Sequence, residues 1–262
     1  MITRKFQMSD NYLNNSNYSQ EYLSKVISLI KRIMDEEENN LKMSAKLIAD
    51  AVENGHNIFA FGCTHSSLPI QDLIYRAGGF MLINPIFGPG ITALDIKPST
   101  ISSAMEQMQG YARVILDNCP IKSGDILILV SVSGRNAVPI EMAMLAHQRG
   151  IKVIGVTSKE YSQAVTSRHP SGNKMHDFAD IVLDNKAPKG DAILEDPRVP
   201  QNFNPVSGVT STALLQALVA ATIEELLSRG ITPPIFLAAN VDGGMEYNAR
   251  LLRKYHDHIF YI

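Results

Sequence analysis

The stretch from residue 127 to residue 136 constrains the fold more than any other part of the sequence. It starts in a short apolar run that ends at Val130, and it passes at once into small polar residues. An apolar run this short, bounded by turn residues, is typical of a buried β-strand. The amphipathic segment 137–149 follows directly and predicts a helix. A strand, a polar turn and a helix in immediate succession indicate an α/β protein.

The polar turn in this stretch predicts an anion site. The start of a helix carries unpaired N–H groups and a partial positive charge. Ser131, Ser133 and Asn136 lie around that start, where small side chains add donors without blocking it. Such a turn can hold a phosphate without a lysine or an arginine. The alternative is that these residues only cap the helix, as Ser and Asn commonly do.

A second unit of the same kind lies earlier in the chain. Residues 57–62 predict a strand, residues 63–67 bring Cys, Thr, His and two Ser, and residues 68–77 have a helical pattern. Each loop alone is explained by helix capping. Two such loops in one chain favour a single anionic ligand held by both.

The rest of the chain alternates between predicted strands and predicted helices. Further strands are expected at 80–84, 152–157 and 180–183, with a last short one at 234–239, and further helices at 99–118, 210–229 and 245–255. This alternation predicts an α/β fold with a doubly wound (flavodoxin-like) parallel sheet and helices on both faces. Ligands of such folds bind at the carboxyl ends of the strands.

The length of the chain indicates a single domain. Its 262 residues, 45% of them hydrophobic, suffice for a sizeable core. Residues 1–17 are polar, so we expect them to be loosely ordered. Residues 18–55 predict N-terminal helices that pack on the domain. Residues 185–206 are rich in Pro, Gly and Asp and predict a long loop, either a lid over the site or a plain surface excursion.

Charge and composition exclude several classes of protein. A net charge of −2 does not fit the basic surface of a nucleic-acid-binding protein. No apolar run approaches the roughly 20 residues of a membrane span, and the N-terminus lacks the apolar core of a signal peptide. Cys63 and Cys119 read as free thiols in a reducing compartment. We therefore expect a cytoplasmic protein with no nucleic-acid or membrane partner.

The two polar loops resemble those of the sugar isomerase (SIS) domain. The second loop carries its Ser-x-Ser-Gly pattern, and the first departs from the pattern at Thr64 and His65. More closely, residues 20–258 resemble a family of poorly characterised bacterial SIS-domain proteins. The phrases that carry this resemblance are Phe61-Gly-Cys-Thr-His-Ser66, Tyr75-Arg-Ala-Gly-Gly79, Val132-Ser-Gly-Arg-Asn-Ala137 and Val206-Ser-Gly-Val-Thr-Ser211.

The resemblance implies a fold, a ligand and an assembly. SIS domains bind phosphorylated sugars at the carboxyl ends of a five-stranded parallel sheet. Carried over by position, Ser66 contacts the phosphate from the first loop, and Ser131, Ser133 and Asn136 contact it from the second. Ser207, at the start of the apolar helix, is a further sugar-binding candidate. The resemblance also implies a homo-oligomer, a dimer or a tetramer, with the site near a subunit interface.

An aldose–ketose isomerase of this kind moves a proton through an enediol. The reaction needs a base near C2 and a proton shuttle for ring opening. Glu106 is the expected base, since related SIS enzymes place a working glutamate in a similar segment. His65, inside the first loop, is the expected shuttle. A carboxylate and a histidine fill these roles without a metal or another cofactor, and the roles of His169 and His176 stay open.

Two other functions remain compatible with these residues. A non-catalytic phosphosugar sensor uses the same loops, and a phosphosugar lyase or etherase uses the same glutamate. A dinucleotide site is excluded, because the first loop lacks the G-x-G-x-x-G pattern and no acidic residue ends the second strand. The sequence identifies neither the sugar phosphate nor the size of the oligomer.

Overall fold

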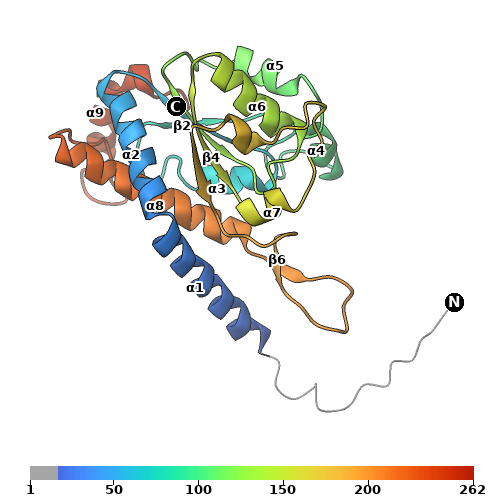
Figure 1. Ribbon diagram of the computed structural model, residues 1–262. Helices are drawn as coiled ribbons and strands as arrows, with labels where there is room; N and C mark the ends of the chain where they lie inside the picture. The colour runs from blue at the N-terminus through green and yellow to red at the C-terminus, as the bar shows by residue number, and fades with distance from the viewer. Residues whose placement is uncertain (1–16) are drawn as a thin grey trace.

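The structure is a computed structural model that describes residues 17–262. The prediction for residues 1–17 lies outside this range except at Asn17. The Asn17 side chain accepts a hydrogen bond of 3.2 Å from the Gln20 N–H and so caps the first helix. Figure 1 shows the helices of the described range arranged around a central sheet.

Five parallel strands form that sheet, in the order β2-β1-β3-β4-β5. The strands are β1 (Ile58–Gly62), β2 (Ile83–Ile86), β3 (Ile126–Val130), β4 (Lys152–Thr157) and β5 (Ile181–Asp184). Every residue of β1 and β3 is buried, as expected for central strands covered on both faces. The predicted α/β fold with a parallel five-stranded sheet is therefore confirmed.

Helices cover one face of the sheet as a layer around α8. This layer contains α1 (Tyr18–Glu36), α2 (Glu38–Glu53), α3 (Leu68–Gln71) and α8 (Ser207–Ser228). Ile58 and Ala60 of β1 point into it, and α8 contacts the other three helices. By length and composition α8 is the one helix of the described range that could cross a membrane. Its buried residues, such as Leu214 and Leu218, instead pack into this core.

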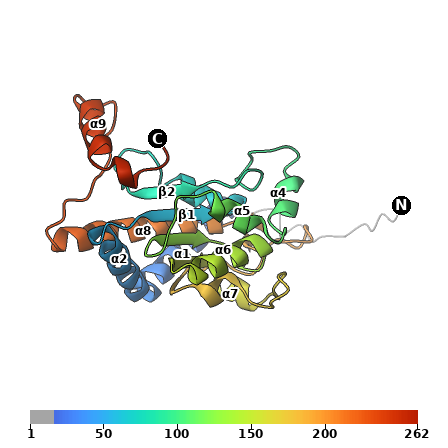
Figure 2. The ribbon, with the colours of Figure 1, turned by 90° about the horizontal axis from the view of Figure 1, so that it is seen from above.

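The opposite face is covered mainly by α5 (Tyr111–Asp117) and α6 (Ala137–Gln148). The alternate residues of β1, Phe59 and Phe61, point into this second core. Nine of the twelve residues of α6 are buried, which explains its almost entirely apolar sequence. The remaining helices are α4 (Thr100–Met105), α7 (Lys159–Gln163) and α9 (Gly244–Lys254). Figure 2 shows α4 and α9 near opposite ends of the molecule.

Several predicted elements differ in the structure. The predicted helix 99–118 is interrupted at Gly110, whose φ of 84° lies outside the helical region. The predicted strand 234–239 does not form; only Ile235 bridges, to Phe80, because two prolines just before it remove backbone donors. The predicted loop 185–206 contains a short hairpin of β6 (Ala192–Leu194) and β7 (Phe203–Pro205).

A buried lysine joins the first two helices to the end of β5. The Lys186 Nζ lies 2.6 Å from Glu37, 2.9 Å from Glu36 and 3.1 Å from Asp184. The Lys186 and Glu37 side chains are 4% and 1% exposed, so water screens their pairing little. Glu37 is also the residue that separates α1 from α2. The cluster therefore fixes the bend between these helices against the carboxyl edge of the sheet.

A substitution at Gly62, the last residue of β1, tests how closely the first loop approaches the end of this strand. A Cβ at this position would lie 2.3 Å from the Ser66 carbonyl oxygen. We expect Gly62→Ala to lower the free energy of unfolding by roughly 1–3 kcal/mol, as overpacking usually does. Gly208→Ala is the control, because nothing lies within 4 Å of its Cβ position, and it should leave stability equal or raise it by at most about 1 kcal/mol. Equal denaturation midpoints for both variants would contradict the close approach.

Candidate functional site

The two predicted loops leave the sheet side by side. Gly62 of β1 pairs with Val130 of β3, so the loops that begin at Cys63 and Ser131 start from neighbouring strands. The chain runs from β1 to β2 on one side and returns to β3 on the other side of β1. Such a switch point is where doubly wound folds bind their ligands. The strand order alone therefore places both loops at a favoured binding position.

The first loop is a tight turn held by its neighbours. It contains a 3₁₀ turn (His65–Ser67), and Thr64 has a φ of 49°, which is strained for a β-branched residue. The Ser67 hydroxyl donates to the Thr64 carbonyl (2.8 Å) and accepts from the Ala93 N–H (3.0 Å). Ser66 is half-buried and His65 is exposed. Among the described residues, neither of these two side chains has a hydrogen-bond partner, so both are free to meet a ligand.

The second loop leads into the start of α6. Ser131 is 5% exposed and Ser133 is half-buried, and within residues 17–262 neither hydroxyl has a hydrogen-bond partner. Asn136 is the N-cap residue of α6, but its side chain makes no capping hydrogen bond. Capping alone therefore does not explain these three side chains. The hydroxyl groups of Ser131 and Ser133, together with the first N–H groups of α6, remain as donors for an anion.

Glu106 lies between the two loops. It ends α4, and its carbonyl oxygen accepts a hydrogen bond of 3.0 Å from the Val138 N–H in the first turn of α6. Its side chain interacts with the Asn136 amide of the second loop. Its carboxylate is also close enough to Cys63 of the first loop to affect the pKa of that thiol. The structure therefore brings Glu106 to both loops, although it lies 25 or more residues from either in the sequence.

Burial gives the Glu106 carboxyl an unusual environment. Loss of water around it raises the pKa of Glu106 above the ordinary range, while the Asn136 amide and the Arg168 charge oppose the rise. A raised pKa favours a carboxylate that takes up protons more readily than an exposed one. The pKa of the neighbouring Cys63 thiol is raised mainly by burial. Cys63 is therefore a packed neutral thiol, and it lacks the lowered pKa of a reactive cysteine.

Two arginines, Arg135 in the second loop and Arg168 beside it, are not among the site residues that the sequence predicted. The Arg168 Nη1 donates to the Asn136 Oδ1 at 3.0 Å, and the Arg135 Nη2 donates to the Thr166 hydroxyl at 3.3 Å. The site can hold an anion without arginine in principle, but here cationic side chains stand beside it. Arg168 lies in a polar loop without periodicity. The one feature that could have identified it as a site residue is its position at the carboxyl edge of the sheet.

His169 and His176, whose roles the sequence leaves undecided, both have partners in the structure. The His169 Nε2 lies 3.5 Å from Glu141, and both Glu141 carboxylate oxygens accept from the Gly110 N–H, at 2.9 and 2.7 Å. Glu141 therefore fixes the start of α5 as well as His169. The His176 Nδ1 lies 3.2 Å from the Ser162 hydroxyl. Neither ring is as free as His65.

Ser207 stands apart from the two loops in its bonding. Its hydroxyl donates to the Asp191 Oδ2 and its N–H donates to the Asp191 Oδ1, both at 2.7 Å. The Val206 N–H also donates to this carboxylate, at 3.1 Å. Asp191, and not Ser207, is therefore the side chain that caps α8. The proton of the Ser207 hydroxyl is committed to Asp191, so this hydroxyl can donate to a sugar only by giving up that bond.

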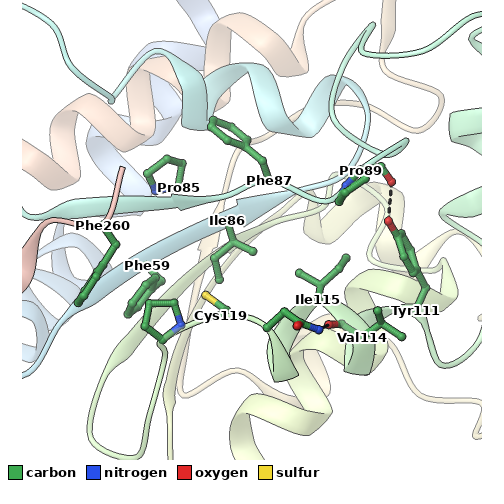
Figure 3. Close-up of a pocket in the computed structure, with 12 residues that line it drawn as sticks. Phe59, Pro85, Ile86, Phe87, Pro89, Tyr111, Val114, Ile115, Cys119 and Phe260 are labelled. Atoms are coloured by element: carbon green, nitrogen blue, oxygen red, sulfur yellow. Dashed lines mark hydrogen bonds between the residues drawn. The ribbon is translucent and has the colours of Figure 1, made fainter. Parts of the chain in front are cut away.

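An apolar cavity lies away from these polar groups. It measures about 400 Å³ and opens between β2, α5 and the C-terminal segment, with Phe87, Ile115 and Phe260 among its walls (Figure 3). The Tyr111 hydroxyl at its rim donates to the Pro89 carbonyl. No carboxylate, arginine or lysine lines it, so it lacks the carboxylate base that an isomerisation through an enediol needs. Residues 17–262 also hold no cluster of three or more His, Cys, Asp or Glu side chains that suits a metal ion.

Replacement of Glu106 by glutamine tests its burial. Because the folded-state pKa of Glu106 is raised, ionisation of this carboxyl weakens the fold as the pH rises through that pKa. We expect Glu106→Gln to unfold at a higher temperature than the wild type at pH 8 and at the same temperature at low pH. Glu195→Gln, at an exposed carboxylate, is the control and should give equal temperatures throughout. The assignment would be refuted if Glu106→Gln unfolded at a lower temperature than the wild type at pH 8 while the two proteins unfolded at equal temperatures at low pH.

Similar proteins place the chain in a family. A family model described as the SIS domain matches residues 21–158. A UPF0309 protein of Streptomyces coelicolor is 47% identical over 241 residues, which cover 92% of this chain and 96% of the relative. A UPF0309 protein of Oceanobacillus iheyensis is 42% identical over 245 residues, which cover 94% of this chain and 99% of the relative.

Solved structures share the fold at low sequence identity. The phosphoheptose isomerase GmhA of Neisseria gonorrhoeae has a TM-score of 0.50 and 17% identity, over 79% of this chain and 97% of that one. A phosphoheptose isomerase of Francisella tularensis has a TM-score of 0.50 and 15% identity, over 83% and 100% of the two chains. At this identity the likeness shows the fold alone. Together with the family model and the close relatives, it leads to one conclusion: the chain belongs to the SIS domain family and, within it, to the UPF0309 proteins.

Proposed function

We propose that this protein binds a phosphorylated sugar between the loops after β1 and β3 and isomerises it. The observation that carries the proposal is the position of Glu106, a half-buried carboxylate that reaches both loops. The hydroxyls of Ser131 and Ser133, which have no partner among residues 17–262, and the start of α6 supply donors for a phosphate. Ser66 adds a hydroxyl from the first loop, and Asn136 adds an amide.

The proposed reaction converts an aldose phosphate to a ketose phosphate. Glu106 removes the proton from C2 while the carbonyl oxygen at C1 gains a proton, which gives an enediol. Transfer of the C2 hydroxyl proton back to the site and delivery of a proton to C1 complete the ketose, so no atom is gained or lost. His65, whose ring is exposed and has no hydrogen-bond partner within the described range, is the proposed carrier of the proton that opens the sugar ring. Neither step calls for a metal or another cofactor.

The proton transfer is tested by the fate of the proton at C2. A panel of aldose and ketose phosphates is incubated with the protein in D₂O and followed by NMR. We expect one pair to interconvert with deuterium taken up from solvent, because the enediol exchanges its proton through Glu106. Glu106→Gln should abolish the exchange and retain ligand binding, while Glu195→Gln should retain both.

The same experiment separates the alternatives. Binding without exchange or conversion would refute the isomerase and favour a sensor. A product with a changed mass, from loss of a substituent, would favour a lyase or an etherase.

The phosphate contacts are tested separately from the chemistry. Ser133→Ala removes one hydrogen bond to a charged group, so we expect phosphosugar binding to weaken by about 1.5–3 kcal/mol. Isothermal titration of the wild type and the variant measures this difference. Ser228→Ala removes an exposed hydroxyl that donates only to the Glu225 carbonyl of its own helix and should leave affinity unchanged. Equal affinity of wild type and Ser133→Ala would count against the loop as the phosphate site.

We also propose that the chain forms one SIS domain that assembles into a dimer or a tetramer in the cytoplasm. Helix α1 extends from the body of the molecule (Figure 1) and exposes Leu23, Ile27 and Met34 at 51%, 55% and 66%. Their spacing of four and seven residues places them on one face. A second copy of this chain would bury that face. The free thiols of Cys63 and Cys119 suit a reducing compartment.

The assembly is tested by a charge on this face. We expect Ile27→Asp to shift the molecular mass in light scattering to a smaller species, because the carboxylate would have to be buried in the interface. Ser28→Asp introduces the same charge on an exposed position of the same helix and should leave the mass unchanged. A wild-type protein that is already monomeric would refute the proposal.

A further inference from the structure

The loop between α7 and the next 3₁₀ turn lies directly against the proposed phosphate loop. The Arg168 N–H donates to the Arg135 carbonyl at 2.8 Å, and the Met175 N–H donates to the Gly134 carbonyl at 2.9 Å. Both acceptors belong to the loop that begins at Ser131. Residues 164–174, which we name the arginine loop, are therefore joined to the phosphate loop near both of their ends.

The arginine loop is also ordered internally. The Ser167 hydroxyl donates to the Asn173 carbonyl at 2.6 Å, and the His169 Nδ1 lies 2.8 Å from the Ser171 hydroxyl. The His169 side chain is 11% exposed and rests against Glu141 of α6. These contacts hold the backbone of Arg168 in place before any ligand arrives. A ligand that uses Arg168 therefore loses little affinity to the ordering of this loop.

The charges around Asn136 are not balanced. Arg168 is exposed, and the only hydrogen bond of its side chain within residues 17–262 is the one to the Asn136 Oδ1. Arg135 bonds the neutral Thr166, and its Nε is buried without a partner. Among the described residues neither arginine forms an ion pair. Two unpaired guanidinium groups thus flank the positive end of α6, an arrangement that an anion would stabilise.

A second polar group points to the same conclusion. Ser131 is 5% exposed, and among the described residues its hydroxyl has no hydrogen-bond partner. The hydroxyl oxygen itself is not one of the fully buried polar atoms, so a ligand can reach it. An anion at this loop would bond this hydroxyl and offset the arginine charge together.

We propose that Arg168 is a specificity-determining residue that binds the phosphoester dianion and so selects phosphorylated over unphosphorylated sugars. The inference rests on the proposed function, because it assigns a partner to the same phosphate. The guanidinium lies one hydrogen bond from Asn136, so a small rotation of its side chain brings two N–H groups to phosphate oxygens in a fork. The neutral hydroxyls of Ser131 and Ser133 then fix the position of the phosphate, and Arg168 supplies attraction that depends on its charge.

Arg168 also acts on Glu106. Its positive charge opposes the rise that burial causes in the pKa of Glu106. The arginine therefore helps to keep the carboxylate ionised, as a base must be when the sugar arrives. Arrival of the phosphate offsets that charge. Arg168 thus acts on Glu106 before the phosphate binds and pairs with the phosphate afterwards.

Titration with inorganic phosphate tests the assignment without knowledge of the sugar. Calorimetry compares the wild type with Arg168→Ala, Arg168→Lys, Arg168→Gln and Ser133→Ala at low and at high salt. We expect Arg168→Ala and Arg168→Gln to bind phosphate about tenfold more weakly, as loss of a charge-assisted hydrogen bond does. We also expect their affinity to depend less on salt, because a charge has been removed. Arg168→Lys should fall between, since it keeps the charge but not the fork.

Arg113→Ala is the matched control, because Arg113 is exposed on α5 and makes no side-chain hydrogen bond in the described range. It changes the net charge equally and should bind phosphate as the wild type does. If Ser133→Ala weakens binding and the Arg168 variants do not, the role of Arg168 is refuted and the proposed function stands. If neither position affects binding, or if the wild type binds no phosphate, both proposals fail. The Arg168→Gln and Arg168→Lys proteins keep the test decisive if the alanine variant does not fold.

Discussion

The hydrogen-bonded register between β1 and β3 is the constraint on which the site depends. It places Gly62 beside Val130, so two loops of small polar residues start about one strand spacing apart, roughly 5 Å. Each loop then turns into a helix on its own side of the sheet. Without this pairing the loops would be two ordinary helix starts. With it, both loops leave the sheet side by side at the switch point of the strand order.

The charged side chains of the proposed site come from segments that are hydrogen-bonded to the second loop or to its helix. Glu106 reaches the site because its carbonyl bonds the Val138 N–H in the first turn of α6. The arginine loop reaches it because Gly134 and Arg135 offer carbonyl groups to it. In both cases a backbone group of the second loop or its helix holds a distant segment in place. The side chains of those segments are thereby positioned without any direct bond between them and the strands.

The sequence predicted the sheet well, because strands buried on both faces carry an apolar run that few other structures share. It also predicted both loops, since small polar residues between a strand and a helix form a local pattern. It placed the second strand at 80–84, whereas β2 spans Ile83–Ile86, because Phe80 and Met81 are apolar for another reason: they pack in the core beside that strand. Apolar character alone does not distinguish these positions.

The parts of the site that the sequence could not predict depend on contacts distant in the chain. Arg168 approaches Asn136 from 32 residues away, and no periodicity marks the loop that carries it. Ser207 looked like a ligand-binding hydroxyl because of its place before a helix, but Asp191 occupies it. Whether a hydroxyl is free or occupied is a property of the packed chain. A local pattern identifies the candidates, and only the fold shows which of them remain available.

The cluster around Lys186 bears on where this domain can be cut. Glu36 and Glu37 lie at the end of α1, and both pair with the buried lysine next to β5. A shortened chain that began after this bend would leave the ammonium group with Asp184 alone, and losing a partner of a buried charge costs about 3–5 kcal/mol. The first helix is thus no detachable extension. The smallest stable version of the domain has to include the bend before α2, together with enough of α1 to hold it.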